Sequence, residues 1–172
     1  MKFLHCSECG SAYADTTRFP RYCACGTIKW ANPTPVAAVM QPVITDKGIG
    51  LVIAKRAIQP MKGHWSLIGG FMEVGETVEE AAEREFREET SLEVQSTPRI
   101  VFTAPVGHDG SQLMLMTCVD KYMPFEVFEQ GTPCSENEEL GVLHSFDELE
   151  LAFPTHQEAV RRYFSGEFEC HR

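Results

Sequence analysis

The glycine pair Gly69-Gly70 and the acidic segment after it constrain this chain more than any other feature. Residues 77–90 carry a helical pattern that begins at Thr77, because Glu80 follows three residues later in the spacing of a capping box. The glycines precede this helix, and without side chains they let a ligand approach the backbone closely. A plain turn is the other interpretation, and the two are compatible. We therefore predict a glycine turn that leads into a helix.

The helix carries acids where a soluble helix normally buries apolar residues. At about 100° per residue, Glu85 and Glu89 fall on the same face as Val78 and Ala82, with Glu88 just beside them. Like charges at this spacing cost about 0.2–0.5 kcal/mol per pair even on an exposed helix. A divalent cation would reverse that cost, because Mg²⁺ prefers oxygen ligands. The alternative is a solvated acidic face, and the apolar residues on the same face argue against it.

The run that begins at Gly70 resembles the Nudix box, G-x5-E-x7-R-E-U-x-E-E-x-G-U, in which U is an apolar residue. Two positions depart from the pattern. Ser91 replaces the glycine that ends the helix in a left-handed conformation, and Ile68 stands where close relatives have proline. We expect these departures to change cap and loop geometry but to remove no catalytic atom. The matching positions are Gly70, Glu76, Arg84, Glu85, Phe86, Glu88, Glu89 and Leu92.

The resemblance covers about residues 33–164 and implies an α/β fold, an α/β/α sandwich with a mixed sheet. It also implies that Glu85, Glu88 and Glu89 bind catalytic Mg²⁺ or Mn²⁺. The backbone carbonyl of Gly69 is the expected further ligand. The catalytic centre is thus predicted on the inner face of one helix and on the turn before it.

Further roles follow from the same resemblance. Glu76 and Arg84 are expected to form an ion pair that braces the loop against the helix. Relatives often take their general base from a late loop, and the candidates in this chain are Glu136, Glu138 and Glu139. We favour Glu139 because it directly precedes a predicted strand. The alternative is a solvated acidic loop.

Arg56 completes the predicted substrate-binding set together with Gly69 and Gly70. Its guanidinium could hold a phosphate, and the alternative is an exposed strand end. Neither His108 nor His156 is assigned a role, since both fit an ordinary surface or capping position. Three aromatic residues are each expected in the core more than on a nucleobase: Trp65, Phe71 and Tyr122.

Four N-terminal cysteines form two close pairs, and Gly10 and Gly26 follow the second cysteine of each. The tight turns that such glycines allow suit a tetrahedral zinc site. A segment this short also needs a bound metal or a cross-link to fold. Residues 1–32 resemble the zinc ribbon that precedes the Nudix domain in some dinucleotide pyrophosphatases, although the second pair has one spacer residue where that family usually has two. His5 is an alternative ligand, and four free thiols in a frayed terminus are the alternative state. The predicted zinc ligands are Cys6, Cys9, Cys23 and Cys25.

The remaining pattern fits one larger domain after the ribbon. Asn32-Pro33-Thr34-Pro35 is an extended connector, and residues 33–172 are assigned to the Nudix domain. Residues 36–44 and 50–57 are predicted to form a hairpin. A terminal helix is predicted over residues 155–164, with Thr155 as its N-cap.

Composition limits the partners of the chain. The net charge of −10 opposes nonspecific binding to nucleic acid. No apolar run reaches the roughly 20 residues of a membrane span. The apolar stretch at residues 1–6 is also far shorter than the core of a signal peptide, so the chain is predicted to be cytoplasmic. In a reducing compartment its seven cysteines, an odd number, are expected to be metal ligands or free thiols rather than disulfides. Relatives are often homodimers, and we expect a homodimer here.

The function implied by the resemblance is metal-dependent hydrolysis of a nucleoside diphosphate linked to another group. The products are a nucleoside monophosphate and a phosphorylated compound. ADP-ribose or FAD is favoured and NADH is less favoured, because the SQPWPFPxS motif associated with NADH is absent. An RNA-cap or NAD-cap hydrolase is a further interpretation within the enzyme class. The alternative class is a non-catalytic nucleotide sensor or nucleic-acid-binding adaptor, which the intact glutamates and the negative charge oppose.

Overall fold

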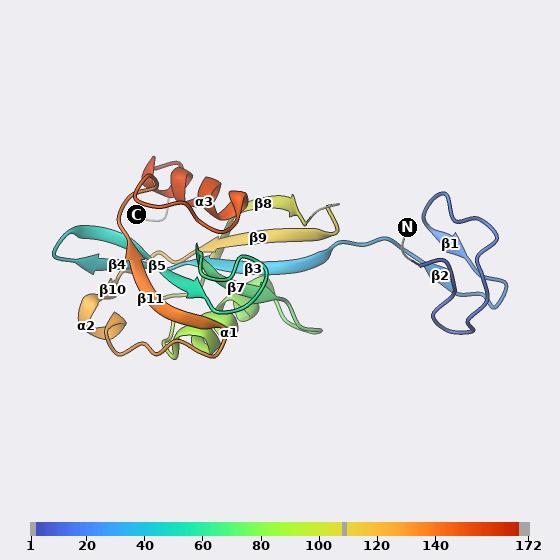
Figure 1. Ribbon diagram of the computed structural model, residues 1–172, viewed down its shortest axis with the longest axis horizontal. Helices are drawn as coiled ribbons and strands as arrows, with labels where there is room; N and C mark the ends of the chain where they lie inside the picture. Colours follow the sequence, from blue (N-terminus) through green and yellow to red (C-terminus); the bar gives the residue numbers. More distant parts are fainter. Residues whose placement is uncertain (1–2, 108–109, 169–172) are drawn as a thin grey trace. The chain divides into compact units, whose positions relative to one another are not determined.

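The computed structural model describes residues 3–107 and 110–168 and divides into two units, Met1–Pro33 and Thr34–Arg172 (Figure 1). The smaller unit contains one antiparallel pair of short strands, β1 (Arg21–Tyr22) and β2 (Ile28–Lys29). Each unit is described by itself.

The larger unit is built on two mixed sheets. The first has the order β7-β3-β9-β8, in which β3 runs parallel to β9 and antiparallel to β7. The second has the order β10-β4-β5-β11, and β6 pairs with β5. Their bounds are β3 (Thr34–Met40), β4 (Pro42–Thr45), β5 (Gly48–Arg56), β6 (Trp65–Ser66), β7 (Ile68–Phe71), β8 (Arg99–Val106), β9 (Gln112–Cys118), β10 (Met123–Pro124) and β11 (Asn137–Leu143).

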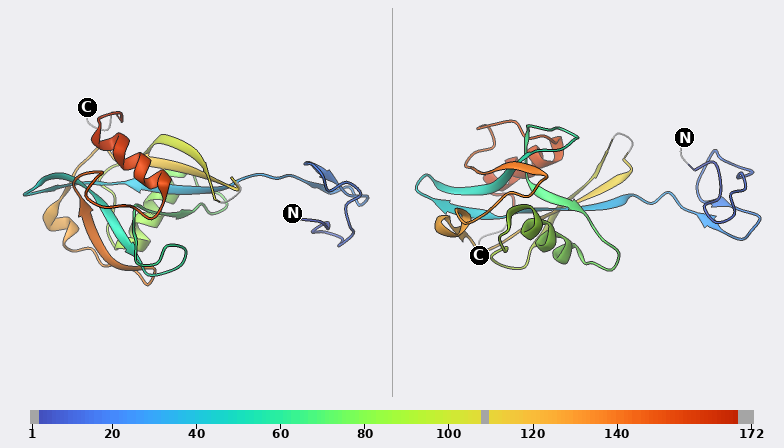
Figure 2. Two further views of the ribbon diagram at one scale, coloured as in Figure 1. Left: turned by 45° about the horizontal axis from the view of Figure 1, so that its top comes forward. Right: turned by 60° about the horizontal axis from the view of Figure 1, so that its bottom comes forward.

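Successive residues of the central strands feed two different cores. In β3, Ala38 and Met40 pack into one core, while Ala37 and Val39 pack into the other. Successive side chains of a strand point to opposite faces, so a strand buried on both faces must be apolar throughout. One core contains residues of α3 (Pro154–Phe164) and the other contains residues of α1 (Val78–Thr90). The two helices therefore cover opposite faces (Figure 2), which confirms the predicted α/β/α layering.

Helix α1 begins and ends largely as its sequence predicts. Thr77 is the N-cap, and its side chain and that of Glu80 form the reciprocal capping box. At the other end Ser91 adopts the left-handed conformation, with φ 59°, that the box normally assigns to glycine. The serine therefore keeps the geometry of the cap at the cost of a strained backbone.

Glycine at this cap is expected to stabilise the protein. Ser91→Gly should raise the free energy of unfolding by about 0.5–1 kcal/mol, because glycine adopts positive φ without the Cβ clash. Ser91→Ala is the matched control, since it removes the hydroxyl and keeps the clash. Urea denaturation measures both variants. A Ser91→Gly protein no more stable than Ser91→Ala would show that the cap is not strained.

Two predicted elements differ from the structure. The strand predicted over residues 36–44 is interrupted at Gln41, whose buried side chain donates to the carbonyls of Pro42 and Lys121 where the chain passes from one sheet to the other. Pro42 contributes no N–H there. The terminal helix starts at Pro154 with Phe153 as N-cap, so the cap prediction for Thr155 was wrong. A short helix that was not predicted, α2 (Phe125–Phe128), follows β10.

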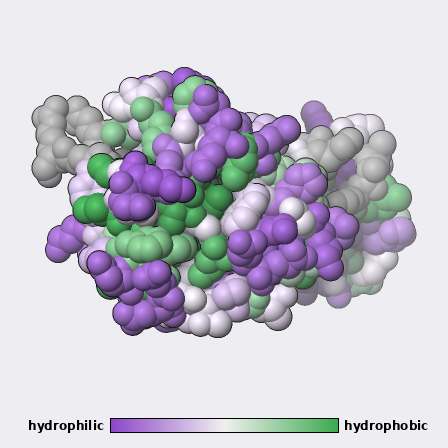
Figure 3. Space-filling model, turned by 60° about the vertical axis from the view of Figure 1, so that its left-hand side comes forward, coloured by the Kyte–Doolittle hydropathy of each residue, from purple (hydrophilic) through white to green (hydrophobic). Residues whose placement is uncertain are grey.

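Hydrophobic residues also reach the surface on the face of the molecule shown in Figure 3, between hydrophilic neighbours. Exposed large apolar residues include Ile44, Ile49 and Phe125. Scattered apolar residues are ordinary on protein surfaces and do not define a partner. Within residues 3–107 and 110–168, none of the helices has both the length and the apolar character of a membrane span.

Candidate active site

Arg84 joins the loop before α1 to the helix itself. Its Nε donates to Oε1 of Glu76 at 2.6 Å, and its Nη2 donates to Oε2 of the same carboxylate at 3.0 Å. Nη2 also donates to the carbonyl of Phe71 at 3.0 Å. These hydrogen bonds from Arg84 lower the pKa of Glu76 to about 2. Such a bidentate pair fixes orientation as well as distance, so it holds the 71–77 loop against α1.

The remaining nitrogen of Arg84 lies between two of the predicted metal ligands. Its Nη1 donates to Oε1 of Glu85 at 2.8 Å and to Oε2 of Glu88 at 3.1 Å. The Glu85 carboxylate is largely buried, and desolvation raises its pKa although Arg84 opposes the shift. Two carboxylates thus already share one cationic group, which shows that their oxygens can approach a common cation.

Glu89 is the most enclosed of the three glutamates. Its Oε1 accepts a hydrogen bond from the backbone N–H of Gly69 at 3.0 Å, and its Oε2 accepts one from Nδ2 of Asn137 at 2.6 Å. Burial nevertheless raises the pKa of Glu89 to about 7. A carboxyl group whose pKa is shifted strongly by its surroundings is characteristic of functional sites. Glu89 therefore ties α1 to the glycine turn and to β11.

The glycine pair brings the backbone into contact with both the sheet and the glutamates. A Cβ on Gly69 would overlap the backbone of Ala37 and Ala38 in β3. A Cβ on Gly70 would lie 2.5 Å from Oε1 of Glu85. The first glycine is thus required for packing, and the second leaves space for a carboxylate.

These residues fit the donor set of a hard divalent cation. Oxygen ligands dominate Mg²⁺ sites, and Glu85 and Glu88 already converge on a cationic nitrogen. Across the described residues, however, the three glutamates do not form a set of ligand atoms close enough to share one ion. Bringing Glu89 to the same ion requires one of its bonds to Gly69 or Asn137 to change.

A cavity of about 710 Å³ opens beside the glycine pair. Its lining includes Gly69, Gly70 and Arg56, so the three predicted substrate-binding residues meet there. Phe71 also lines it and is 54% exposed, which corrects the expectation that this ring lies in the core. The volume is within the range of small-molecule sites. A second cavity, of about 590 Å³, has none of the box residues in its lining.

The candidate general bases lie in different places. Glu136 lines the cavity, and its charge acts on both Glu85 and Glu89. Glu138 instead pairs with Lys55 at 3.8 Å. Glu139 is an exposed residue within β11 and is not part of the cavity lining. The structure does not bring Glu139 to the site, and it brings Glu136 there.

Comparison with known proteins places this geometry in a family. The NUDIX domain matches residues 33–164, which is most of the chain. The chain belongs to the Nudix family. A NUDIX hydrolase structure from Nitrosomonas europaea has 24% identity and a TM-score of 0.68 over 95% of this chain and 91% of that one. The NUDIX domain of Shewanella oneidensis NrtR, crystallised with ADP ribose, has 16% identity and a TM-score of 0.66 over 79% of this chain and 89% of that one.

One curated relative of this Nudix protein carries an activity in its name. The ADP-ribose pyrophosphatase of Methanocaldococcus jannaschii is 49% identical over 55 residues. The match covers 32% of this chain, and the chain spans about a third of the length of that relative. The similarity is therefore strong but short.

Sequence reasoning missed two residues of the Nudix site. Asn137 holds Glu89, but an asparagine in a loop-like segment gives no sign of a partner 48 positions away. His156 was assigned no role and is 4% exposed, with its ring in the cavity lining. The signal that could have found it is helical spacing, which places His156 on one face of α3 with the buried Ala159, Val160 and Tyr163. His108 lies outside the described residues.

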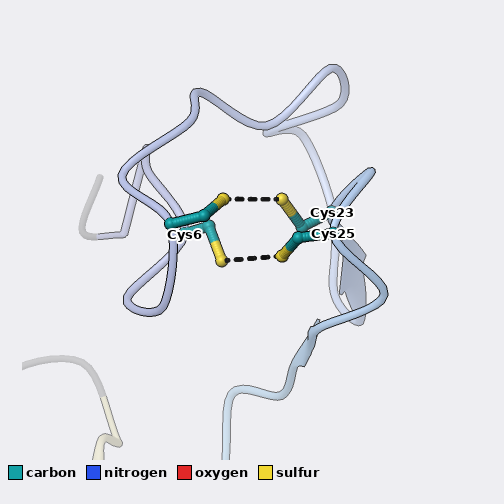
Figure 4. A group of neighbouring side chains, drawn as sticks. Cys6, Cys23 and Cys25 are labelled. Atoms are coloured by element: carbon teal, nitrogen blue, oxygen red, sulfur yellow. Dashed lines mark hydrogen bonds between the residues drawn. The ribbon is translucent and has the colours of Figure 1, made fainter.

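The four N-terminal cysteines of the Nudix protein converge (Figure 4). Their sulfurs all lie within 4.8 Å of one another, and the pairs Cys6–Cys25 and Cys9–Cys23 are 3.7 and 3.5 Å apart. Sulfurs around a tetrahedral zinc at 2.3 Å are about 3.8 Å apart, so the set fits that ion. Backbone N–H groups of Cys9 and Glu8 lower the pKa of Cys6 to about 6, which favours the thiolate that a metal requires. His5 is not part of the set.

Proposed function

We propose that this Nudix protein is a pyrophosphohydrolase that cleaves the diphosphate of a nucleoside diphosphate linked to another group. The observation that carries the proposal is the cavity that ends on Gly69 and Gly70 beside Glu85. An anionic diphosphate in that place needs a cation between itself and the glutamates, and the donor set of the glutamates suits Mg²⁺ or Mn²⁺. ADP-ribose is the favoured substrate, FAD is the second candidate and NADH the third.

Each residue has a specific task in this proposal. A bound divalent ion supplies charge neutralisation and activation of water for attack on phosphorus. Glu85, Glu88 and Glu89 hold the ions, with the Gly69 carbonyl as a further ligand. Arg56 binds a phosphate oxygen, because its Nε is already used on the carbonyl of Pro60 and its Nη groups have no partner among the described residues.

The proposed general base is Glu136, in place of Glu139. It lines the cavity from the loop that leads into β11, within electrostatic range of Glu85 and Glu89. A carboxylate at that position can accept the proton of the attacking water. Glu139 is not part of the cavity lining, so we favour Glu136 over it.

The choice of ADP-ribose rests on the relatives. The archaeal relative is named an ADP-ribose pyrophosphatase, and the structurally similar NrtR domain was crystallised with ADP ribose. The apolar walls of the cavity, among them Phe71 and Ile58, suit the planar base of such a compound.

Hydrolysis of a compound panel tests the proposal. Purified protein is incubated with ADP-ribose, FAD, NADH or nucleoside triphosphates, with Mg²⁺ or Mn²⁺, and the products are separated by chromatography. Glu88→Gln is expected to lower kcat by at least about 100-fold, because it removes a charge that faces the ion. Glu83→Gln, on the same helix and without a hydrogen bond from its side chain in the described structure, is the matched control.

The results separate the two classes of function. Release of AMP from ADP-ribose by wild-type protein and Glu83→Gln, but not by Glu88→Gln, supports the enzyme. Nucleotide binding without turnover of any compound would support the sensor. Equal turnover by Glu88→Gln and wild type would contradict the assignment of the glutamates.

We further propose that residues 1–32 form a structural zinc ribbon and that residues 33–172 form the catalytic domain. Purified protein is expected to contain one zinc per chain by elemental analysis, and Cys9→Ser to contain almost none, because three sulfurs hold zinc poorly. Cys118→Ser is the control, since Cys118 lies in the core of the larger unit. A zinc content of one ion per chain in Cys9→Ser would contradict the proposed zinc ribbon. A homodimer remains a prediction.

A further inference from the structure

His156 lines the cavity, and one of its ring nitrogens already accepts a hydrogen bond from the backbone. The backbone N–H of Leu67 donates to its Nδ1 at 3.2 Å. A backbone N–H can only donate, so Nδ1 carries a lone pair and the proton is on Nε2. The ring is therefore neutral, and burial agrees with this by lowering its pKa to about 4.

The surroundings of the ring fix its direction. Phe153 contacts it edge to face, with the ring centroids 5.1 Å apart and the planes at 67°. The charge of Arg56 acts on His156, and its guanidinium lies 5.3 Å from the centre of the Phe153 ring. Arg56 has only donors, so it cannot accept a proton from His156. In the described part of the chain, no residue accepts a hydrogen bond from Nε2.

The Nε2–H group of His156 opens to the cavity, since Nε2 is not among the fully buried polar atoms that lack a hydrogen-bond partner. An acceptor on a ligand in the cavity would replace water as its partner, which gives a modest net gain in binding free energy. His156 is 4% exposed and contributes to the cavity lining, so an acceptor can reach Nε2 only from within the cavity. Because the ring is uncharged, it has no special attraction for phosphate. A neutral acceptor such as a ring nitrogen or a carbonyl oxygen suits it better.

The position of Leu67 defines which part of a nucleotide meets His156. Leu67 precedes Gly69 by two residues, or about 7 Å of extended chain. With the diphosphate at Gly69 and Gly70, a ribose spans this distance and the base follows. The neighbouring walls, Leu67, Met114 and Ile58, are apolar and fit the faces of a flat ring.

Resting on the proposed function, we propose that the Nε2–H of His156 binds a hydrogen-bond acceptor of the substrate's purine base. The residue then selects the base, while the glycine turn and the glutamates act on the diphosphate. His156 takes no proton in the reaction, so its removal weakens binding and leaves the chemical step largely unchanged.

Two variants separate the nitrogens of the ring. In His156→Asn the amide oxygen replaces Nδ1 as acceptor for Leu67, and the donor to the cavity is lost. In His156→Gln the longer amide restores a donor near the position of Nε2. We expect His156→Asn to raise KM for ADP-ribose by about 3- to 10-fold, the value of one neutral hydrogen bond, with kcat within about twofold. His156→Gln should recover part of the loss.

Base analogues identify the acceptor itself. ADP-ribose carrying 1-deaza-, 3-deaza- or 7-deazaadenine lacks one ring nitrogen at a time. With wild-type protein, one analogue should have a KM that is higher than that of ADP-ribose by about the same factor. With His156→Asn, that analogue and ADP-ribose should have the same KM, because the hydrogen bond that both changes remove is one and the same. A purely structural role of His156 would change KM for all compounds by the same factor. That result, or an unchanged KM in His156→Asn, would overturn the inference.

Binding of AMP and its deaza analogues, measured by calorimetry, keeps this test independent of turnover. One outcome is that wild-type protein hydrolyses no compound, binds AMP more tightly than His156→Asn does, and binds one deaza analogue more weakly than AMP by the same factor. In that case the proposed function fails and the His156 contact stands. If wild type hydrolyses ADP-ribose and His156→Asn has the same KM and the same affinity for AMP, the contact fails alone. Thermal melts of both variants confirm that they are folded.

Discussion

Gly70→Ala is expected to lower kcat by about 100-fold or more while the protein remains folded. The new Cβ would lie 2.5 Å from Oε1 of Glu85, so the carboxylate must move by about an ångström. Displacements of that size at a catalytic group cost about 100-fold. The fold should tolerate the change, because the obstacle is the end of a flexible side chain and the backbone of Gly70 is not in the left-handed region. Kinetics with ADP-ribose and a thermal melt measure the two effects.

A double-mutant cycle is the control for Gly70→Ala. In a Glu85→Gln background the same substitution should have little further effect on kcat, since the carboxylate that it displaces has already been neutralised. Additive losses would show that Gly70 acts independently of Glu85. Gly69→Ala provides a contrast, because its Cβ would meet the backbone of β3 and should unfold the protein.

Glu89→Gln is expected to stabilise the protein above neutral pH although it lowers activity. Burial raises the pKa of Glu89 from 4.5 to about 7, so between these values the folded protein holds a proton that the unfolded chain has released. The contribution of Glu89 to the free energy of unfolding therefore falls as pH rises from about 4.5 to 7, and it stays at the lower value above pH 7. The deficit corresponds to about 3 kcal/mol, which the neutral amide avoids.

Urea denaturation at pH 8 and pH 5, without added Mg²⁺ or Mn²⁺, measures this effect. Glu89→Gln should be more stable than wild type at pH 8, by up to about 3 kcal/mol. The difference should fall to about 1 kcal/mol or less at pH 5, where Glu89 of the folded wild type is mostly protonated. Glu83→Gln should show no such pH dependence. A Glu89→Gln protein less stable than wild type at pH 8 would mean that the bonds from Gly69 and Asn137 outweigh the burial of charge.

The sequence predicted local features well because local rules determine them. The capping box at Thr77 and the extent of α1 follow from contacts within four residues. These features belong to short stretches of chain, so no knowledge of the tertiary structure is needed to predict them. The α/β/α layering was instead implied by the family resemblance, and the strands buried on both faces agree with it.

The features that sequence could not place depend on register and on long-range packing. Glu139, favoured as the base, lies in β11, which starts at Asn137 and carries a register shift between Asn137 and Glu139, and the cavity lining includes Glu136 instead. A one-residue change in a strand moves a side chain to the other face. His156 was missed because its surroundings depend on what α3 packs against, although its spacing with Ala159 and Tyr163 already places it on the buried face of the helix.

Arg84 has a consequence for how the acidic face of α1 is assembled. Its guanidinium is anchored on Glu76 through two nitrogens and offers Nη1 to Glu85 and Glu88. The repulsion between these carboxylates is thus balanced by a charge that belongs to the chain itself. A divalent ion that binds there must replace Nη1 of Arg84 as the partner of these carboxylates. Its measured affinity therefore reports the difference between binding the ion and keeping the hydrogen bonds from Nη1. Because Glu76 holds the rest of the guanidinium, that exchange requires only a small displacement and leaves the loop attached to the helix.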